Sequence, residues 1–469
     1  MPFPFVPGRT EPRVVDLSDP RDDVLIHTSR TELDEICRVG DIEALSKVEG
    51  SFATVARNGV TIRLARTLGR PLRYFVAKRE TGPYLVVADR IDTIADYCRR
   101  EGIEWQFHPS YTRLVPAHHL TELDQVGCPD PNPRYRRFFA PEPGSGPADT
   151  NALAIGYFEA LRSSIAAVVD LLPPEAPIGV AFSGGADSTA VAALVGEVLS
   201  GRNEKDRLRL YTLSVEEGGD RQAARTAAEA LGFGNRWSAV EASADLLDLE
   251  RAVACIEDYR PLDVQCAAVE RAFLGKLRKM DPRLVFLFDG DGGDENWKSY
   301  PLEDSELTIR SVLNNPLLYH EGWGVDSIKH SLTYSGGLSR GIVRGFAPAR
   351  EFGFQLLSPH ASRPAIAAAL AAPLRDLVGE DSERLLALKG EVVRAGLRAI
   401  GKDAPIAPKR RFQHGATSPS AFRSRLAATR PELRRMHEAR FAGFAEPGGR
   451  EERSDTAQDA AREDVSPVA

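Results

Sequence analysis

The amino-acid sequence predicts an α/β protein in which a domain built on a parallel β-sheet follows a smaller, β-rich domain. At 469 residues the chain is long enough for two or three domains. The parallel sheet is predicted by three short apolar runs that alternate with segments of helical periodicity, such as 220–232 and 264–280. These apolar runs are PIGVAF (177–182), RLYTLSV (209–215) and LVFLFD (284–289).

The first part of the chain has a different pattern. Short segments of alternating apolar and polar residues are separated by Gly or Asn turn signals, which predicts antiparallel strands and hairpins. The segments are SFATVAR (51–57), VTIRLAR (60–66), LRYFVAK (72–78) and YLVVADR (84–90).

A proline-rich segment separates the two patterns. Residues 129–150 contain six prolines, which interrupt both helix and strand, and we interpret them as a linker. The predicted organisation is therefore a β-rich domain over 1–128, this linker, an α/β domain over 151–425, and a polar, partly disordered tail over 426–469.

Composition narrows the classes of partner. The net charge is −7 and charges of both signs are mixed along the chain, so no basic footprint for nucleic acid is visible. The start of the chain lacks the pattern of a secretory leader, and its most apolar stretch, 365–374, is too short to span a bilayer. We expect a cytoplasmic protein without membrane or nucleic-acid partners, and we leave open whether it forms a homodimer. Its widely spaced cysteines indicate reduced thiols, not a disulfide framework: Cys37, Cys98, Cys128, Cys255 and Cys266.

A glycine-containing turn follows the first predicted parallel strand. The residues SGGADS (183–188) lie between that strand and a predicted helix, where free N–H groups and the helix dipole favour an anion. The two glycines would let the backbone approach phosphate oxygens, the two serines add hydroxyl donors, and Asp187 offers a carboxylate to a phosphate-bound Mg²⁺. An ordinary capped turn is the alternative.

This turn resembles the pyrophosphate-binding loop, SGGxDS, of the ATP-pyrophosphatase enzymes. The resemblance implies that Ser183, Gly184, Gly185, Asp187 and Ser188 bind ATP. We assign three further residues to the nucleotide site: Leu213, Ser214 and Gly290. The loop is shared by asparagine, GMP and NAD synthetases and by several tRNA-modifying enzymes, so it does not choose among them.

A second cluster follows the strand at 284–289. The sequence DGDGGDE (289–295) places four carboxylates around three glycines, and such a density of negative charge favours a metal–phosphate site over a solvated acidic loop. It resembles the SGEGADE signature of asparagine synthetases and β-lactam synthetases. The resemblance places Asp291 at the catalytic Glu position and makes Asp294, with Asp187, a ligand of Mg²⁺.

A third segment, APKRRFQHG (407–415), resembles the RxKxxFxxG pattern of the same family. The match implies that Lys409 is the catalytic lysine that reaches the reacting phosphates, where a preorganised cation stabilises developing charge. Ala407 stands at the position of the family's Arg. Taken alone, the segment is more typical of a solvated basic surface, and the other two motifs are what favours the catalytic assignment.

The first domain resembles the glutamine-amidohydrolase half of asparagine synthetases. Its matches to the RDxxGxxPLYY pattern are Arg66, Gly69, Pro71 and Leu72. Those enzymes use an N-terminal cysteine as nucleophile, whereas position 2 here is Pro2, so we expect a structural remnant that does not hydrolyse glutamine.

Two segments depart from the family's pocket-forming sequences. Residues 352–364 replace the usual ExRxPFLD pattern, with Gln355, Leu357 and Ser362 at its charged positions, and residues 296–330 replace the usual LFGGY continuation. We expect a different second-substrate pocket. Four candidates for this pocket are not assigned to the catalytic set: Trp297, Lys298, His320 and His330.

Together these resemblances imply an ATP-dependent ligase that forms an amide bond through an acyl-adenylate, with ATP and Mg²⁺ as cofactors. Its substrates would be a small-molecule carboxylate and either ammonia or a substrate amine, with a role in specialised-metabolite biosynthesis as one setting. The alternatives are a tRNA- or nucleotide-modifying ATP pyrophosphatase and a non-enzymatic nucleotide sensor.

Overall fold

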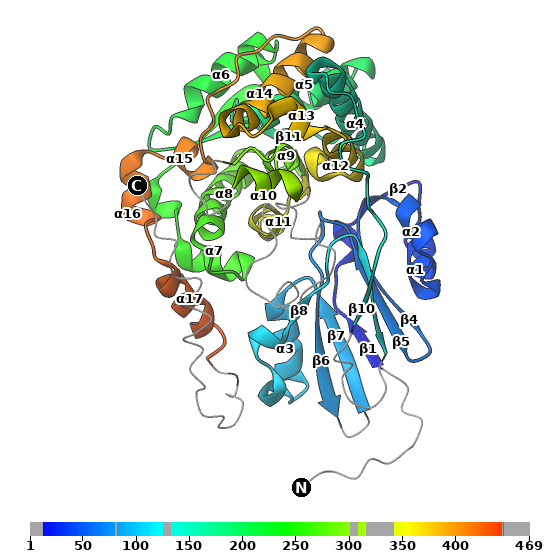
Figure 1. Ribbon diagram of the computed structural model, residues 1–469. Helices are drawn as coiled ribbons and strands as arrows, with labels where there is room; N and C mark the ends of the chain where they lie inside the picture. Colours follow the sequence, from blue (N-terminus) through cyan, green and yellow to red (C-terminus); the bar gives the residue numbers. More distant parts are fainter. Residues whose placement is uncertain are drawn as a thin grey trace. The chain divides into compact units, whose positions relative to one another are not determined.

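The structure, a computed structural model, describes residues 13–79, 82–124, 133–300, 308–315, 342–442 and 444. The described chain divides into two compact units. Of these described residues, unit 1 contains those up to Phe139 and those from Phe441 to Phe444, and unit 2 contains those from Ala140 to Arg440. Figure 1 traces both units along the sequence.

Unit 1 consists of four layers: helices, sheet, sheet and helix. The two four-stranded sheets have the strand orders β10-β9-β5-β4 and β1-β7-β6-β8. One apolar cluster, including Leu64 and Leu85, lies between the two sheets, a second lies between α1, α2 and the first sheet, and a third lies between α3 and the second sheet. The strands are β1 (Arg13–Asp16), β4 (Ala53–Asn58), β5 (Thr61–Arg66), β6 (Arg73–Arg79), β7 (Gly82–Ala88), β8 (Arg113–Leu114), β9 (His119–Asp124), β10 (Arg134–Arg137), and the separate pair β2 (Val24–Ile26) and β3 (Glu49–Ser51). The helices are α1 (Arg30–Val39), α2 (Ile42–Lys47) and α3 (Ile91–Arg100).

The four strands predicted in this unit are present as β4, β5, β6 and β7, in the antiparallel pairs β4–β5 and β6–β7. The strand β10 lies inside 129–150, which the sequence predicted to be a linker, and pairs with β9. The strand is only four residues long, RYRR, and the flanking prolines obscured it.

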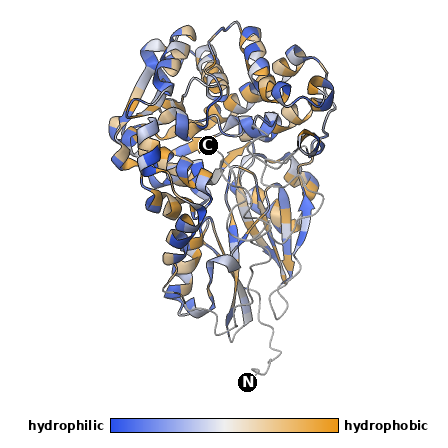
Figure 2. Ribbon diagram, turned by 60° about the vertical axis from the view of Figure 1, so that its left-hand side comes forward, coloured by the Kyte–Doolittle hydropathy of each residue, from blue (hydrophilic) through white to orange (hydrophobic). Residues whose placement is uncertain are grey.

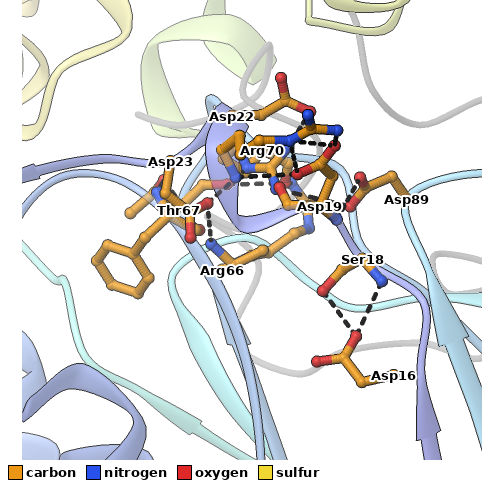
Figure 3. Close-up of polar contacts among 12 residues, drawn as sticks. Asp16, Ser18, Asp19, Asp22, Asp23, Arg66, Thr67, Arg70 and Asp89 are labelled. Carbon is orange, nitrogen blue, oxygen red and sulfur yellow. Dashed lines mark hydrogen bonds and ion pairs between the residues drawn. The ribbon is translucent and has the colours of Figure 1, made fainter. Parts of the chain in front are cut away.

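Two buried arginines organise one end of unit 1 (Figure 3). Arg70 donates to the carboxylate of Asp23 at 2.7 Å and to the carbonyl of Asp19 at 2.9 Å. Arg66 donates to the backbone carbonyls of Val115, Thr67 and Arg70. Arg66, which matches the amidohydrolase pattern, thus joins its own turn, 66–70, to the backbone at Val115.

Unit 2 contains a five-stranded sheet in the order β13-β12-β11-β14-β15, and every neighbouring pair is parallel. Because β11 leads to β12 and β13 on one side, whereas β14 and β15 lie on the other, the strand order reverses between β11 and β14. The predicted α/β fold with a parallel sheet is confirmed. The strands are β11 (Ile178–Ala181), β12 (Leu208–Val215), β13 (Trp237–Ala242), β14 (Phe286–Phe288) and β15 (Gln355–Leu357).

Helices cover both faces of this sheet. Tyr211, Leu213 and Val215 of β12 join an apolar cluster with α7, α8 and α11, while α5 contacts β11 and β12 and packs in turn against α4 and α14. Figure 2 shows hydrophobic and hydrophilic residues alternating along many of these elements, as expected for elements with one buried face. The helices are α4 (Thr150–Leu171), α5 (Ala186–Gly201), α6 (Asp220–Ala230), α7 (Leu249–Ile256), α8 (Pro261–Met280), α9 (Gly293–Trp297), α10 (Ile309–Asn314), α11 (Ile342–Glu351), α12 (Arg363–Leu370), α13 (Leu374–Val378), α14 (Ser382–Ala399), α15 (Phe412–Ala416), α16 (Pro419–Arg425) and α17 (Arg430–Ala439).

Two helices concern what the sequence predicted about membrane spans and about the polar tail. Among the described residues, α4 is the one helix long and apolar enough to cross a membrane, but it packs against α5, α12 and α14 as a core helix does. The helix α17 lies within 426–469, which was predicted to be a polar tail, and packs against α7. Leu433 on its buried face is the apolar anchor that the polar composition concealed.

We predict that Arg66→Ala destabilises unit 1. The substitution removes the donors of three buried carbonyl groups, and an unsatisfied buried group costs about 1–3 kcal/mol. The melting temperature of the full chain should fall, whereas Arg21→Ala, at a side chain that is 86% exposed, should leave it almost unchanged. Loss of ATP-dependent activity by Arg66→Ala at an unchanged melting temperature would instead indicate a functional site in unit 1.

Candidate active site

The two glycine-containing motifs meet at the reversal point of the parallel sheet. The SGGADS loop follows β11 and the DGDGGDE loop follows β14, and these strands are direct neighbours with Ile178 paired to Phe286. In open α/β sheets, ligands bind in the crevice outside the carboxyl ends of the strands where the strand order reverses. The fold therefore brings together two motifs that are about a hundred residues apart in sequence.

The SGGADS loop requires glycine at position 184. Gly184 has φ of +74°, and a Cβ there would lie 2.9 Å from the backbone of Ala224 in α6. The loop is closed by its own hydroxyl groups: the N–H of Ser183 donates to Ser188 Oγ at 3.2 Å, and the N–H of Gly185 donates to Ser183 Oγ at 3.3 Å. Helix α5 begins at Ala186, so its N-terminal N–H groups lie in the loop itself.

The acidic loop lies directly against the first loop. A Cβ at Gly293 would lie 2.2 Å from Asp187 Oδ1, and a Cβ at Gly290 would lie 3.0 Å from the N–H nitrogen of Ser188. The glycines between the carboxylates therefore allow Asp187 and Asp294 to approach each other, which a side chain at either position would prevent.

A lysine lies between these two carboxylates. Lys389 of α14 is 4% exposed, and its Nζ donates to Asp187 Oδ2 at 2.5 Å and to Asp294 Oδ1. Burial alone lowers the pKa of Lys389, but the two carboxylates outweigh burial and hold it well above its ordinary value. Burial alone would raise the pKa of Asp294, but the ammonium groups of Lys389 and Lys409 outweigh this effect and lower the pKa to about 2.

Lys409 reaches the same carboxylate from the opposite side. Its Nζ donates to Asp294 Oδ2 and lies 5.8 Å from the centre of the Tyr300 ring. The segment that carries Lys409 is joined to the SGGADS loop by a hydrogen bond of 2.9 Å from the N–H of Ala407 to the carbonyl of Gly184. Lys409 is thus at the site and not on a remote basic surface.

These groups line a cavity of about 680 Å³ within unit 2, inside the range of roughly 300–1,000 Å³ typical of small-molecule sites. Most of the residues predicted to bind ATP or metal or to act in catalysis line it: Ser183, Gly185, Asp187, Ser188, Leu213, Gly290, Asp291, Asp294 and Lys409. Gly184 and Ser214 do not. Gly184 faces α6, and Ser214 is 3% exposed within β12, where it is paired with Glu241 of β13.

Another part of the cavity lining is acidic. Glu270 of α8 belongs to it together with Asp289 and Asp291 of the acidic loop, and Arg344 of α11 is the basic group beside them. Burial is the largest cause that raises the pKa of Asp291, to about 6, with Arg344 opposing it. The cavity lining therefore contains two charged clusters: Lys389 and Lys409 with Asp187 and Asp294, and Arg344 with Glu270, Asp289 and Asp291.

A buried polar network holds the acidic loop in place. The side-chain amide of Asn296 donates to Tyr157 Oη at 3.0 Å and to the carbonyl of His360 at 2.8 Å. Tyr157 Oη and His360 Nδ1 are 2.7 Å apart, and His360 Nε2 lies 3.3 Å from the carbonyl of Asp187. Burial lowers the pKa of His360, so a neutral imidazole connects the two loops.

The predicted pocket candidates have other roles or lie outside the described residues. Trp297 is fully buried in the core, and Lys298 is buried and donates to the carbonyl of Asn315 at 2.9 Å. His320 and His330 lie outside the described residues. Two segments depart from the family's sequences. Residues 352–364 contribute no described residue to the cavity lining, whereas the segment 296–330 contributes Ser299 and Tyr300 to it.

The comparison with known families agrees with this site. The asparagine synthase family model matches residues 160–439, which is more than half of the chain. The chain belongs to the asparagine synthase family. This asparagine synthase family member is therefore an ATP-dependent ligase of the amide-forming kind, and the match extends through α17. No match was found among the curated proteins.

The carboxylates suit a metal ion that is shared with phosphate. Within the described ranges no group of three or more His, Cys, Asp or Glu side chains is arranged to hold a metal. Mg²⁺ is commonly held by one or two carboxylates plus substrate phosphates, so Asp187 and Asp294 would suffice once a nucleotide is present. The buried Asp187 Oδ1 has no hydrogen-bond partner, as expected of an oxygen that a cation would use.

Three residues of this asparagine synthase family site were missed by sequence reasoning: Lys389, Glu270 and Arg344. Lys389 had a detectable signal, because it stands at helical spacing between Leu385 and Val393 on the buried face of α14. A lysine on an apolar face requires a buried counter-ion. Glu270 and Arg344 gave no comparable local signal, since only the fold brings α8 and α11 to the cavity.

We predict that Lys389→Met destabilises the protein more than Lys409→Met does. Removing one partner of a buried ion pair typically costs about 3–5 kcal/mol, and the loss here should be about 2–3 kcal/mol because Asp187 and Asp294 are 18% and 23% exposed. Lys409 is 35% exposed, so its loss should cost less. Urea denaturation of the full chain measures both.

Magnesium provides the control for that comparison. Mg²⁺ should recover part of the stability of Lys389→Met, since a divalent cation can replace the ammonium between the carboxylates, but not that of the double variant Lys389→Met/Asp294→Asn. Equal destabilisation by the two lysine variants would show that Lys389 does not compensate these carboxylates.

Proposed function

We propose that this protein activates a small-molecule carboxylate with ATP as an acyl-adenylate, releasing pyrophosphate, and transfers the acyl group to ammonia or to a substrate amine. The observation that carries the proposal is the cavity at the sheet's reversal point, where Lys389 and Lys409 flank the SGGADS loop. Formation of a specialised metabolite in the cytoplasm is the proposed setting.

The part of the cavity beside Lys389 and Lys409 suits the pyrophosphate. The N–H groups of the loop and of the first turn of α5 can donate to phosphate oxygens, and the helix dipole has its positive end there. Lys389 and Lys409 would stabilise the charge that builds on pyrophosphate as its bond to the α-phosphate breaks. Mg²⁺, held by Asp187 and Asp294, would neutralise the phosphates when bound.

The amine is proposed to come from a source other than glutamine. In the described part of unit 1, Cys37 and Cys98 are fully buried, and burial raises the pKa of each thiol to about 12. Neither can serve as a thiolate nucleophile at neutral pH. Pro2 and Cys128 lie outside the described residues.

Membership of the asparagine synthase family supports this ligase over a tRNA-modifying pyrophosphatase or a nucleotide sensor. A nucleotide sensor would also not need the acidic part of the cavity lining, which contains Glu270 and Asp291.

The test is the release of pyrophosphate from ATP across a panel of acidic metabolites, with and without ammonium, following AMP and pyrophosphate separately. One carboxylate should give AMP and pyrophosphate. Asp294→Asn and Lys409→Met should lower this rate on the order of 10²- to 10³-fold, the cost of losing one preorganised charge. Lys279→Met, which removes an exposed charge at the end of α8, is the control. ADP and orthophosphate as products would contradict the mechanism.

We further predict that glutamine supports no more amide formation than buffer does, because the described thiols of unit 1 are protonated and buried. The measurement is glutamate release beside amide formation at equal concentrations of glutamine and ammonium. Glutamate release that keeps pace with amide formation would show a functioning amidohydrolase.

A further inference from the structure

The acidic part of the cavity lining has three carboxyl groups and one guanidinium group. Glu270, Asp289 and Asp291 line it, and Arg344 is the guanidinium beside them. Arg344 is also shared with two carboxylates that do not line the cavity, since it lies 3.9 Å from Asp263 and 4.0 Å from Glu295. A positively charged ligand bound here would favour the ionised form of these carboxyl groups.

Glu270 is the member of this group that is free to contact such a ligand. Asp289 Oδ1 accepts the N–H of Asp291 at 3.1 Å, whereas the Glu270 carboxylate accepts no hydrogen bond from the described residues. Its neighbours on the cavity wall are the apolar Leu262 and Phe273 and the thiol of Cys266. A carboxylate placed among such groups lacks the solvation that it has in water.

The protonation of Glu270 fits a role in proton transfer. Burial raises its pKa to about 8, with a further rise from Asp291 and an opposing effect of Arg344. Burial raises the pKa of the neighbouring Cys266 to about 12 and that of Tyr300 well above its ordinary value, so neither competes as a base near neutral pH. A general base works best when its pKa is near the working pH.

We propose that Glu270 binds the acceptor as an ammonium cation and removes its proton, so that the acceptor is ammonia or an amine that is positively charged in solution. This inference rests on the proposed function, in which the phosphates bind beside Lys389 and Lys409 in the same cavity. It makes Glu270 a catalytic residue and defines the chemistry of the second substrate.

The step balances as follows. The Glu270 carboxylate takes one proton from the ammonium group, and the lone pair so exposed on nitrogen attacks the acyl carbon of the adenylate. The new C–N bond forms as the C–O bond to AMP breaks, and AMP leaves with that electron pair. The second proton lost by the nitrogen passes to Asp291.

The first test measures the Glu270 carboxyl directly by ¹³C NMR of the full chain labelled at glutamate, with the signal assigned from its loss in Glu270→Gln. Glu270 should titrate near pH 8, and methylammonium chloride should lower that midpoint relative to sodium chloride at equal ionic strength, because a bound cation favours the carboxylate. The exposed Glu250 of α7 is the internal control. A midpoint in the ordinary carboxylate range, or one that is the same in both salts, would overturn the proposal.

The second test separates activation from transfer, using the carboxylate that releases pyrophosphate with the wild-type chain. Glu270→Gln should release pyrophosphate normally in a single turnover but form amide with methylamine about 10²-fold more slowly. Hydroxylamine, which is largely uncharged at neutral pH, should still trap the adenylate, and Glu270→Asp should recover part of the transfer rate.

The outcomes of the second test are distinct. Unchanged amide formation in Glu270→Gln, or equal loss of trapping and amide formation, would overturn the role of Glu270 alone. Absence of pyrophosphate release by the wild-type chain with every carboxylate would overturn the proposed function, and the NMR titration would then decide the role of Glu270 separately.

Discussion

The parallel pairing of β11 with β14 is the constraint on which the site depends. Each strand ends in a loop whose glycines allow close approach, and the pairing of Ile178 with Phe286 puts both loops at the same edge of the sheet. The two carboxylates that follow, Asp187 and Asp294, are thereby forced together in a partly buried place. Their mutual repulsion has to be compensated, and that requirement explains why α14 and the 407–415 segment each contribute a lysine.

The charged residues of the cavity lining form two clusters, to which the proposed function gives different roles. In the proposed function, Lys389 and Lys409 stabilise the anionic leaving group, and Glu270 and Asp291 receive the cationic nucleophile. An enzyme that joins a carboxylate to an amine through ATP needs both kinds of environment, because one substrate brings negative and the other positive charge. The low-dielectric walls, such as Phe273, strengthen each effect.

Local signals account for what the sequence could predict. The strands β11, β12 and β14 are short apolar runs beside glycine-containing loops, so both their positions and their role could be inferred before the structure. The strand β13 was missed because Trp237–Ala242 mixes apolar, small and charged residues, and β15 because three residues carry too little pattern. Lys389 and Glu270 lie on α14 and α8, far from the motifs, and their function depends on tertiary contacts that periodicity does not reveal.

The most direct measurement of the central claim is a crystal structure with α,β-methylene-ATP and Mg²⁺, an analogue that resists cleavage at the proposed bond. The account predicts the β- and γ-phosphates on the N–H groups of the 183–188 loop, within contact distance of Lys389 and Lys409, with the metal on Asp187 and Asp294. A nucleotide bound elsewhere in unit 2, or phosphates turned toward Glu270 and Asp291, would contradict it.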